Sequence, residues 1–250
     1  MHFSIYQAET KYSKNLYYRI LLMISLQGKC GIIEPMSLRE KANEIFDWGV
    51  KQRRDDIVGA WVAHSHGAAE ICEKIAAKCG LDVEKAYACG LLHDIGRYKG
   101  TETGLNHIID GYEFLMQKDL PEIARVCLTH TFNPKDKVDH VKLDDPDKVI
   151  FLKNYIKNTE YDDYDLLTQL ADYMAGAHGI TTIERRFCSV LWRHGLKNPQ
   201  KDLIALYKLK DYFSEKVGKD IYELFHDEVM RSTLNGTPGL YIKDSDAQEE

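Results

Sequence analysis

The sequence predicts an all-α protein. Segments bounded by helix-capping residues and by proline or glycine follow one another along most of the 250 residues. Apolar residues within these segments recur at helical spacing, and no stretch shows the period-two alternation of a half-buried strand. We therefore expect about ten helices packed around one core.

The first helices have clear start and stop signals. Ser37-Leu38-Arg39-Glu40 has the S-x-x-E pattern of a capping box, so a helix should begin there. Asp55 and Asp56 can cap the next helix, and Gly80 suits the position just after its end. Asp82 can cap a third helix. These signals predict helices over 37–54, 57–79 and 83–94.

Later helices are marked mainly by proline and glycine. Pro121 suits the first turn of a helix that ends near His130, and Asp145-Pro146 combines a cap with a first-turn proline. Pro199 and Gly218 bracket another helix in the same way. The predicted helices after the third are 106–117, 121–130, 147–157, 163–177, 182–194, 199–217 and 220–232.

These helices suggest one domain, 37–233. Residues 1–35 are expected to be an N-terminal extension outside the fold, and the acidic stretch 234–250 a flexible tail. The apolar run Ile20–Leu26 is too short to span a bilayer, which takes about 20 residues. We expect no membrane partner.

The charge and the cysteines limit the class of partner and the compartment. The formal net charge is −6, which argues against a general binder of nucleic-acid polymers or acidic membranes. A local basic pocket for a small phosphate ligand remains compatible with it. The six cysteines contain no C-x-x-C pair, so they are interpreted as reduced thiols of a cytoplasmic protein.

Three histidines stand on apolar stripes of three different predicted helices. His64 lies in line with Trp61, Ala68 and Ile71, whereas His66 points about 200° round the helix. The other two are His93, which follows Ala86 and Gly90, and His130, which follows Ile123 and Cys127. We expect all three imidazoles to face the interior.

Two carboxylates accompany these histidines. Asp94 directly follows His93 at a helix end, where neighbouring side chains can share a metal ion. Asp172 lies on a face of small and polar residues rather than in an apolar stripe. A buried ionised carboxylate is costly unless it is paired or metal-bound, so these inward groups need a common partner. A divalent metal would supply it.

At this point the chain resembles the HD-domain metal-dependent phosphohydrolase superfamily (HDIG-type). The matching segments are Trp61-Val62-Ala63-His64-Ser65, Gly90-Leu91-Leu92-His93-Asp94-Ile95-Gly96-Arg97 and Leu170-Ala171-Asp172-Tyr173. The resemblance covers about 45–175 and implies a multi-helix HD domain followed by additional C-terminal helices. It also implies that His64, His93, Asp94 and Asp172 bind one divalent metal.

Some branches of this superfamily hold a second metal. Here His107, with Gly111 one turn later, and His130 match the positions of its ligands, and Asp94 would bridge the two ions. Several two-metal members have consecutive histidines where this chain has His130-Thr131. His140 and His178 are alternatives in loop-like contexts. The resemblance leaves open one ion or two, and Fe, Mn, Mg, Zn or Co.

The activity that the resemblance implies is hydrolysis of a phosphoester or phosphoanhydride bond by a metal-activated water. Asp94 and Arg97 are the expected catalytic residues, and the candidate phosphate ligands are Arg97, Lys99, Arg185 and Arg186. The expected substrate is a nucleotide or other small phosphorylated molecule. A GYP motif, typical of the cyclic-di-GMP phosphodiesterases, is absent from the sequence.

An alternative function belongs to a different class. The same fold could serve as a non-catalytic sensor that binds metal and nucleotide without hydrolysing the nucleotide. The complete ligand set favours the enzyme, since a degenerate site would be free to lose ligands. The sequence leaves the oligomeric state open.

Overall fold

The computed structural model describes residues 36–53, 58–100 and 105–234. Internal contacts divide the chain between Ser37 and Leu38. Of the first unit only the last two residues are described, and the second unit, from Leu38 onward, contains every helix and strand reported below.

Several sequence predictions fall outside the described residues. These are the N-terminal extension, 1–35, and the tail apart from its first residue, 235–250. The capping role of Asp55 and Asp56 also falls there. The predicted division into an extension, a domain over 37–233 and a tail therefore stays a prediction.

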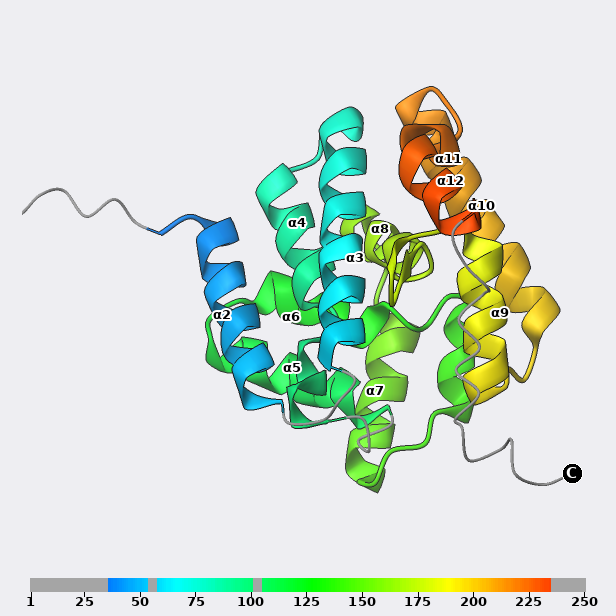
Figure 1. Ribbon diagram of the computed structural model, residues 1–250. Helices are drawn as coiled ribbons and strands as arrows, with labels where there is room; N and C mark the ends of the chain where they lie inside the picture. The colour runs from blue at the N-terminus through cyan, green and yellow to red at the C-terminus, as the bar shows by residue number, and fades with distance from the viewer. Residues whose placement is uncertain (1–35, 54–57, 101–104, 235–250) are drawn as a thin grey trace, which may run out of the picture. The chain divides into compact units, whose positions relative to one another are not determined.

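The second unit is helical, which confirms the predicted all-α class (Figure 1). Its α-helices are α2 (Leu38–Gln52), α3 (Val58–Cys79), α4 (Val83–Leu92), α5 (Asn106–Gln117), α6 (Pro121–Thr129), α7 (Pro146–Asn158), α8 (Asp163–Asp172), α9 (Ile183–His194), α10 (Pro199–Val217), α11 (Ile221–Leu224) and α12 (His226–Leu234). Two 3₁₀ helices connect them, η1 (Ile95–Lys99) and η2 (Lys135–His140). None of the described helices combines the length and apolar character needed to cross a bilayer.

Helix α3 is the centre of the second unit. It packs against α4, α8 and α10, and Figure 1 shows it standing between α4 and α8. One side of α3 places Ala68 and Ile71 in an apolar core with α8 and the C-terminal helices. Another side places Trp61 and Ala69 in a second core with α2, α4 and α6. Because α3 is apolar on more than one side, it is buried, and polar side chains on it face other buried groups.

Two glycines allow backbones to approach closely around the H-D dipeptide. A Cβ atom on Gly90 would lie 2.6 Å from the Ala68 carbonyl oxygen, so α4 packs backbone to backbone against α3. A Cβ atom on Gly96 would lie 2.6 Å from the Gly111 nitrogen, so η1 packs in the same way against α5. These contacts fix the segment that contains His93 and Asp94 against two neighbouring helices.

Helix α8 is shorter than the sequence predicts. It ends at Asp172, not near residue 177, and the chain then forms a small antiparallel hairpin of β1 (Ala175–Gly176) and β2 (Gly179–Ile180). Gly179 adopts φ +111°, which a helix cannot accommodate and which favours glycine. The hairpin makes Asp172 the last residue of its helix.

The predicted helix over 220–232 is also wrong in one respect. The structure divides it into α11 and α12 at Phe225, whose φ of −117° and ψ of 33° are not helical. The Phe225 side chain is fully buried in the C-terminal core. Burial of this aromatic ring accounts for the break in a segment whose local pattern favours one helix.

Candidate metal centre

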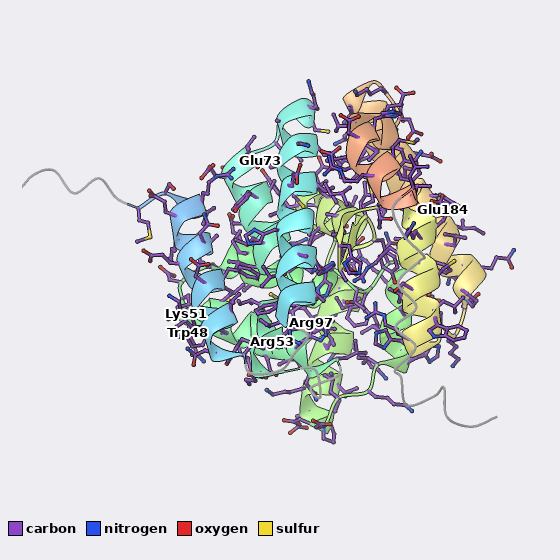
Figure 2. All side chains as sticks on the ribbon, viewed as in Figure 1. Trp48, Lys51, Arg53, Glu73, Arg97 and Glu184 are labelled. Atoms are coloured by element: carbon purple, nitrogen blue, oxygen red, sulfur yellow. The ribbon has the colours of Figure 1, made fainter. Side chains whose placement is uncertain are left out.

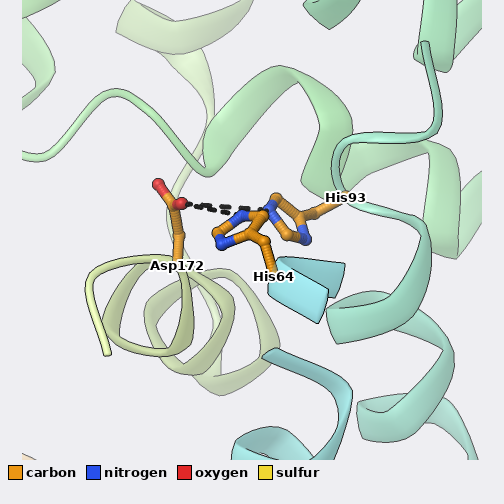
Figure 3. A group of neighbouring side chains, drawn as sticks. All are labelled: His64, His93 and Asp172. Carbon is orange, nitrogen blue, oxygen red and sulfur yellow. Dashed lines mark hydrogen bonds and ion pairs between the residues drawn. The ribbon is translucent and has the colours of Figure 1, made fainter. Parts of the chain in front are cut away.

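One group of ligand atoms joins three helices (Figure 3). His64 comes from α3, His93 follows α4 directly, and Asp172 ends α8. The Nε2 atoms of His64 and His93 are 3.1 Å apart. Asp172 Oδ1 lies 3.3 Å from His64 Nε2 and 3.9 Å from His93 Nε2. His64 is buried and His66 exposed, as the helical periodicity predicts.

A second group lies beside the first. Asp94 precedes η1, His107 is in the first turn of α5, and His130 follows α6. Asp94 Oδ1 lies 3.0 Å from His107 Nε2 and 3.5 Å from His130 Nε2. The other oxygen, Oδ2, lies 3.8 Å from His64 Nε2 and 3.9 Å from His93 Nε2. Asp94 therefore turns one carboxylate oxygen toward each group.

Backbone carbonyls orient the imidazoles of His64, His93 and His130. His64 Nδ1 lies 2.9 Å from Ala175 O, and His93 Nδ1 lies 2.7 Å from Gly90 O. His130 Nδ1 lies 3.0 Å from Cys127 O. A carbonyl can only accept a hydrogen bond, so Nδ1 carries the proton in each ring. In the neutral imidazoles, Nε2 then offers a lone pair to the interior of the site.

These donors fit divalent cations. With ligand bonds of about 2.1 Å, neighbouring ligands of one ion stand roughly 3.0–3.5 Å apart, which is close to the shorter distances in both groups. Two neutral imidazoles that face each other across 3.1 Å repel unless a cation lies between their lone pairs. Nitrogen and carboxylate oxygen together suit iron, manganese, zinc or cobalt better than magnesium. The structure thus contains a His/Asp cluster that could hold metal.

The electrostatics keep the ligands in the forms that bind cations. Burial lowers the pKa of His93 to about 3 and also lowers the pKa of His107. Burial would raise the pKa of Asp94, but Arg97 and the nearby imidazoles hold it well below its usual range. Burial opposes ionisation of Asp172 too, and its contact with His64 lowers the pKa instead. The carboxylates are ionised and His93 is neutral at pH 7.

His130 differs from the other imidazoles in its electrostatic setting. Burial alone would lower its pKa, but Asp94 raises it above the usual value. In the absence of a metal, the Asp94 carboxylate therefore favours a proton on His130. A divalent cation would compete with that proton for the same nitrogen.

The predicted basic residues divide into those at the cluster and those elsewhere. Arg97 Nε donates to Asp94 Oδ2 at 2.5 Å, and Arg97 is labelled in Figure 2. Arg186 Nη2 lies 3.6 Å from Asp172 Oδ1. In contrast, Lys99 pairs with Asp110 at 2.7 Å. For Arg185, the structure shows its backbone N–H capped by Thr182. The roles assigned to Lys99 and Arg185 in phosphate binding stay predictions.

The two alternative histidines lie away from both groups. His140 and His178 are exposed, and His140 Nδ1 lies 3.1 Å from Lys197 Nζ. The sequence analysis missed three cationic residues that interact electrostatically with the cluster, Lys137, Arg193 and His194. Arg193 follows Arg186 by seven residues, a spacing that places both on one helical face and was available in the sequence.

Comparison with known proteins agrees with this geometry. The sequence model of the HD domain family matches residues 61–177, which include all six ligand candidates. Curated relatives are named Ribonuclease Y. The protein from Mycoplasma capricolum is 35% identical over 80 residues, which cover 32% of this chain and 16% of that protein. The protein from Lawsonia intracellularis is 44% identical over 68 residues, covering 27% and 13%. No solved structure matches significantly.

The similarity is confined to a segment. In the two relatives from Mycoplasma capricolum and Mycoplasma mycoides, the matched part spans about a sixth of their length. It corrects one expectation nonetheless. The expectation that no nucleic-acid polymer is a partner is wrong, because the curated relatives are named as ribonucleases. Net charge describes the average over the whole chain, whereas contact with a polyphosphate backbone depends on cations within a Debye length of about 8–10 Å.

The family resemblance drawn from the sequence is confirmed by the family match and by the named relatives. The matched segment extends from α3, which carries His64, to the hairpin after Asp172. Residues 61–177 of this chain are therefore an HD domain.

Proposed function

We propose that this chain hydrolyses a phosphodiester or phosphoanhydride bond at a two-metal site. One observation carries the proposal: Asp94 turns Oδ2 toward the group of His64, His93 and Asp172, and Oδ1 toward His107 and His130. A carboxylate placed in this way would serve as a ligand to both groups' cations. Divalent ions there would supply an activated water and positive charge for the phosphoryl oxygens.

The chain's own residues have distinct tasks in this proposal. His64, His93 and Asp172 would hold the first ion, and His107 and His130 would hold the second. The carbonyls of Ala175, Gly90 and Cys127 keep the imidazoles oriented, because each accepts the Nδ1 proton. Asp94 connects the two groups and is fixed by η1, whose glycine packs against α5.

Two arginines are the proposed phosphate ligands. Arg97 lies on Asp94, and Arg186 Nε donates to the Asp172 backbone oxygen at 3.4 Å. Both guanidinium groups are thus attached to metal-ligand residues and retain N–H groups that can bind non-bridging phosphate oxygens. A substrate phosphate at the metals would lie within reach of both.

The substrate remains to be found by experiment. RNA is the first candidate, because the relatives that share this segment are named as ribonucleases. Nucleotides are the second, because the site needs only a phosphoryl group and a leaving oxygen. A cytoplasmic location is part of the proposal and agrees with the described cysteines, which are free.

The decisive experiment counts metal and turnover in the same preparation. Purified protein should contain two transition-metal equivalents per chain by mass spectrometry, and should hydrolyse bis(p-nitrophenyl) phosphate when loaded with Mn²⁺, Fe²⁺ or Co²⁺. A panel of 5′-phosphorylated RNA and nucleotides then identifies the substrate. Bound metal and tight nucleotide binding without turnover of any substrate would favour the sensor instead.

A further inference from the structure

A group of cations from η1 and α9 lies on the carboxylate side of the candidate metal centre. It consists of Arg97 from η1 and of Arg186, Arg193 and His194 from α9, and is called the cationic cluster below. Arg97 contacts Asp94, and Arg186 lies 3.6 Å from Asp172, so the two arginines flank the bridging carboxylate and the terminal one. Arg193 stands two helical turns after Arg186 on the same face of α9.

Arg193 has no carboxylate partner of its own in the described part of the chain. Its Nε donates only to the Ser189 carbonyl, at 3.3 Å. Arg193 and His194 are exposed, and partial desolvation together with neighbouring cations lowers the pKa of each. The neighbouring cations are Arg186 and Arg97 for Arg193, and Arg193, Arg97 and Arg186 for His194. The cations therefore repel one another, and an anion among them would remove that repulsion.

Two common explanations of clustered cations do not cover this arrangement. The helix dipole favours cations in the last turn, where Arg193 and His194 lie, but it disfavours Arg186 in the first turn of the same helix. A generally basic surface does not explain the cluster either, because the chain has a net charge of −6. A gathering of cations beside two metal-binding carboxylates indicates a site for an anion.

We propose that the cationic cluster binds a second phosphate group of the substrate, next to the phosphate that is cleaved. The proposal rests on the proposed function and narrows its substrate class to molecules with at least two phosphates in neighbouring linkages. Guanidinium groups suit this task, since each can give a phosphate two parallel hydrogen bonds. Adjacent phosphates occur both in RNA and in nucleoside polyphosphates, so the cluster recognises chemistry that the two share.

Two matched substrates test the proposal. Thymidine 5′-(p-nitrophenyl phosphate) carries one phosphate, and its 3′-phosphorylated form carries two with the same leaving group. Arg193→Ala should lower kcat/KM for the bisphosphate by about tenfold, as expected for one lost arginine–phosphate contact, and leave the monophosphate substrate unchanged. Arg231→Ala is the control, because it removes an exposed arginine from α12 without touching the cluster.

Binding of inorganic pyrophosphate gives a readout that does not depend on catalysis. Calorimetry should show pyrophosphate affinity reduced about tenfold by Arg193→Ala and unchanged by Arg231→Ala. Equal effects of Arg193→Ala on both thymidine substrates, or unchanged pyrophosphate affinity, would overturn the second-phosphate site. If the wild type hydrolyses neither substrate with any metal, the proposed function fails, and pyrophosphate binding alone then decides the inference.

The same variants distinguish the sources of the second phosphate. Turnover of a 5′-phosphorylated RNA oligonucleotide and of ATP is measured with wild type and with Arg193→Ala. The substrate that loses about tenfold in kcat/KM is the one whose second phosphate binds the cluster. Loss for neither, when wild type turns over both, counts against the proposal.

Discussion

Each end of α8 carries a buried or half-buried carboxylate, and the groups that surround the two carboxylates differ. Asp165, in the first turn, is fully buried. Arg125 pairs with both of its oxygens, Thr129 Oγ1 donates at 2.7 Å, and the Asp162 backbone N–H donates at 3.0 Å. Both Asp165 oxygens therefore already accept hydrogen bonds from N–H or O–H donors.

Asp172, at the other end, faces two imidazole nitrogens and lies 3.6 Å from Arg186 Nη2. His64 Nε2 and His93 Nε2 lie 3.3 and 3.9 Å from Oδ1, and the Nδ1 atoms of both rings already donate to carbonyls. The comparison teaches how to separate a structural carboxylate from a metal ligand. A carboxylate enclosed by N–H and O–H groups stabilises the fold, whereas one that faces lone pairs calls for a cation.

The largest expected effect is on activity. Asp94→Ala should reduce hydrolysis at least about 10³-fold, because it removes the group that connects the two sets of ligands and several kcal/mol of transition-state stabilisation. Metal content should fall, while far-ultraviolet circular dichroism stays close to that of wild type. Full turnover in this variant would show that Asp94 is not a metal ligand in catalysis.

Substitution of Asp165 should lower the free energy of unfolding rather than the activity. Asp165→Ala leaves Arg125 without its carboxylate, and loss of one partner of a buried pair costs about 3–5 kcal/mol of unfolding free energy. Urea denaturation at 25 °C measures this cost. Metal content and turnover per folded chain should match wild type. A loss of metal from this variant would contradict the purely structural role of Asp165.

A smaller effect should separate the two ligand groups. His130→Ala removes one ligand of the second group and should lower metal content from two equivalents to one, with activity reduced about 10–100-fold. The first group stays complete. Exposed His140→Ala serves as the matched control, and equal metal content in His130→Ala and wild type would contradict the two-ion assignment.

The smallest effect, taken per pH unit, is a pH dependence of the stability of the metal-free protein. Because the pKa of His93 is about 3 in the folded chain, against 6.5 for an ordinary histidine, the unfolded chain binds the extra proton between these pH values. Stability should therefore fall as pH falls through this window, by up to about 1.4 kcal/mol per pH unit for this site. Chelator-treated protein is measured by urea denaturation, and His93→Gln should flatten the slope while Asp165→Ala keeps it.

Helical periodicity was sufficient to predict the burial of three histidines in the candidate metal centre. It predicted that His64, His93 and His130 face the interior, and their burial confirms this for all three. Asp172 stood out because its face lacks large apolar residues. Their function as ligands stays a prediction until metal is measured, but their convergence follows from apolar stripes that must face one core.

The sequence was less informative where distant contacts decide the outcome. The hairpin after Asp172 depends on a positive φ at Gly179 and on packing against α3, neither of which a helical pattern reveals. Asp165 resembled a first-turn helix residue, and only the fold brings Arg125 to it. Arg193 was not singled out, because Arg97 lies almost a hundred residues away in the chain and only the fold lets the two cations interact.

The link between Asp172 and Ala175 has a consequence for how the chain tolerates changes in length. Asp172 supplies a candidate ligand, and three residues later the Ala175 carbonyl holds the His64 ring in place. A residue inserted between them would shift the carbonyl away from Nδ1 and disturb two ligands at once. An insertion at the hairpin tip, near exposed His178, would leave that spacing intact. The number of residues between Asp172 and Ala175 therefore matters more than the identity of the residues between them.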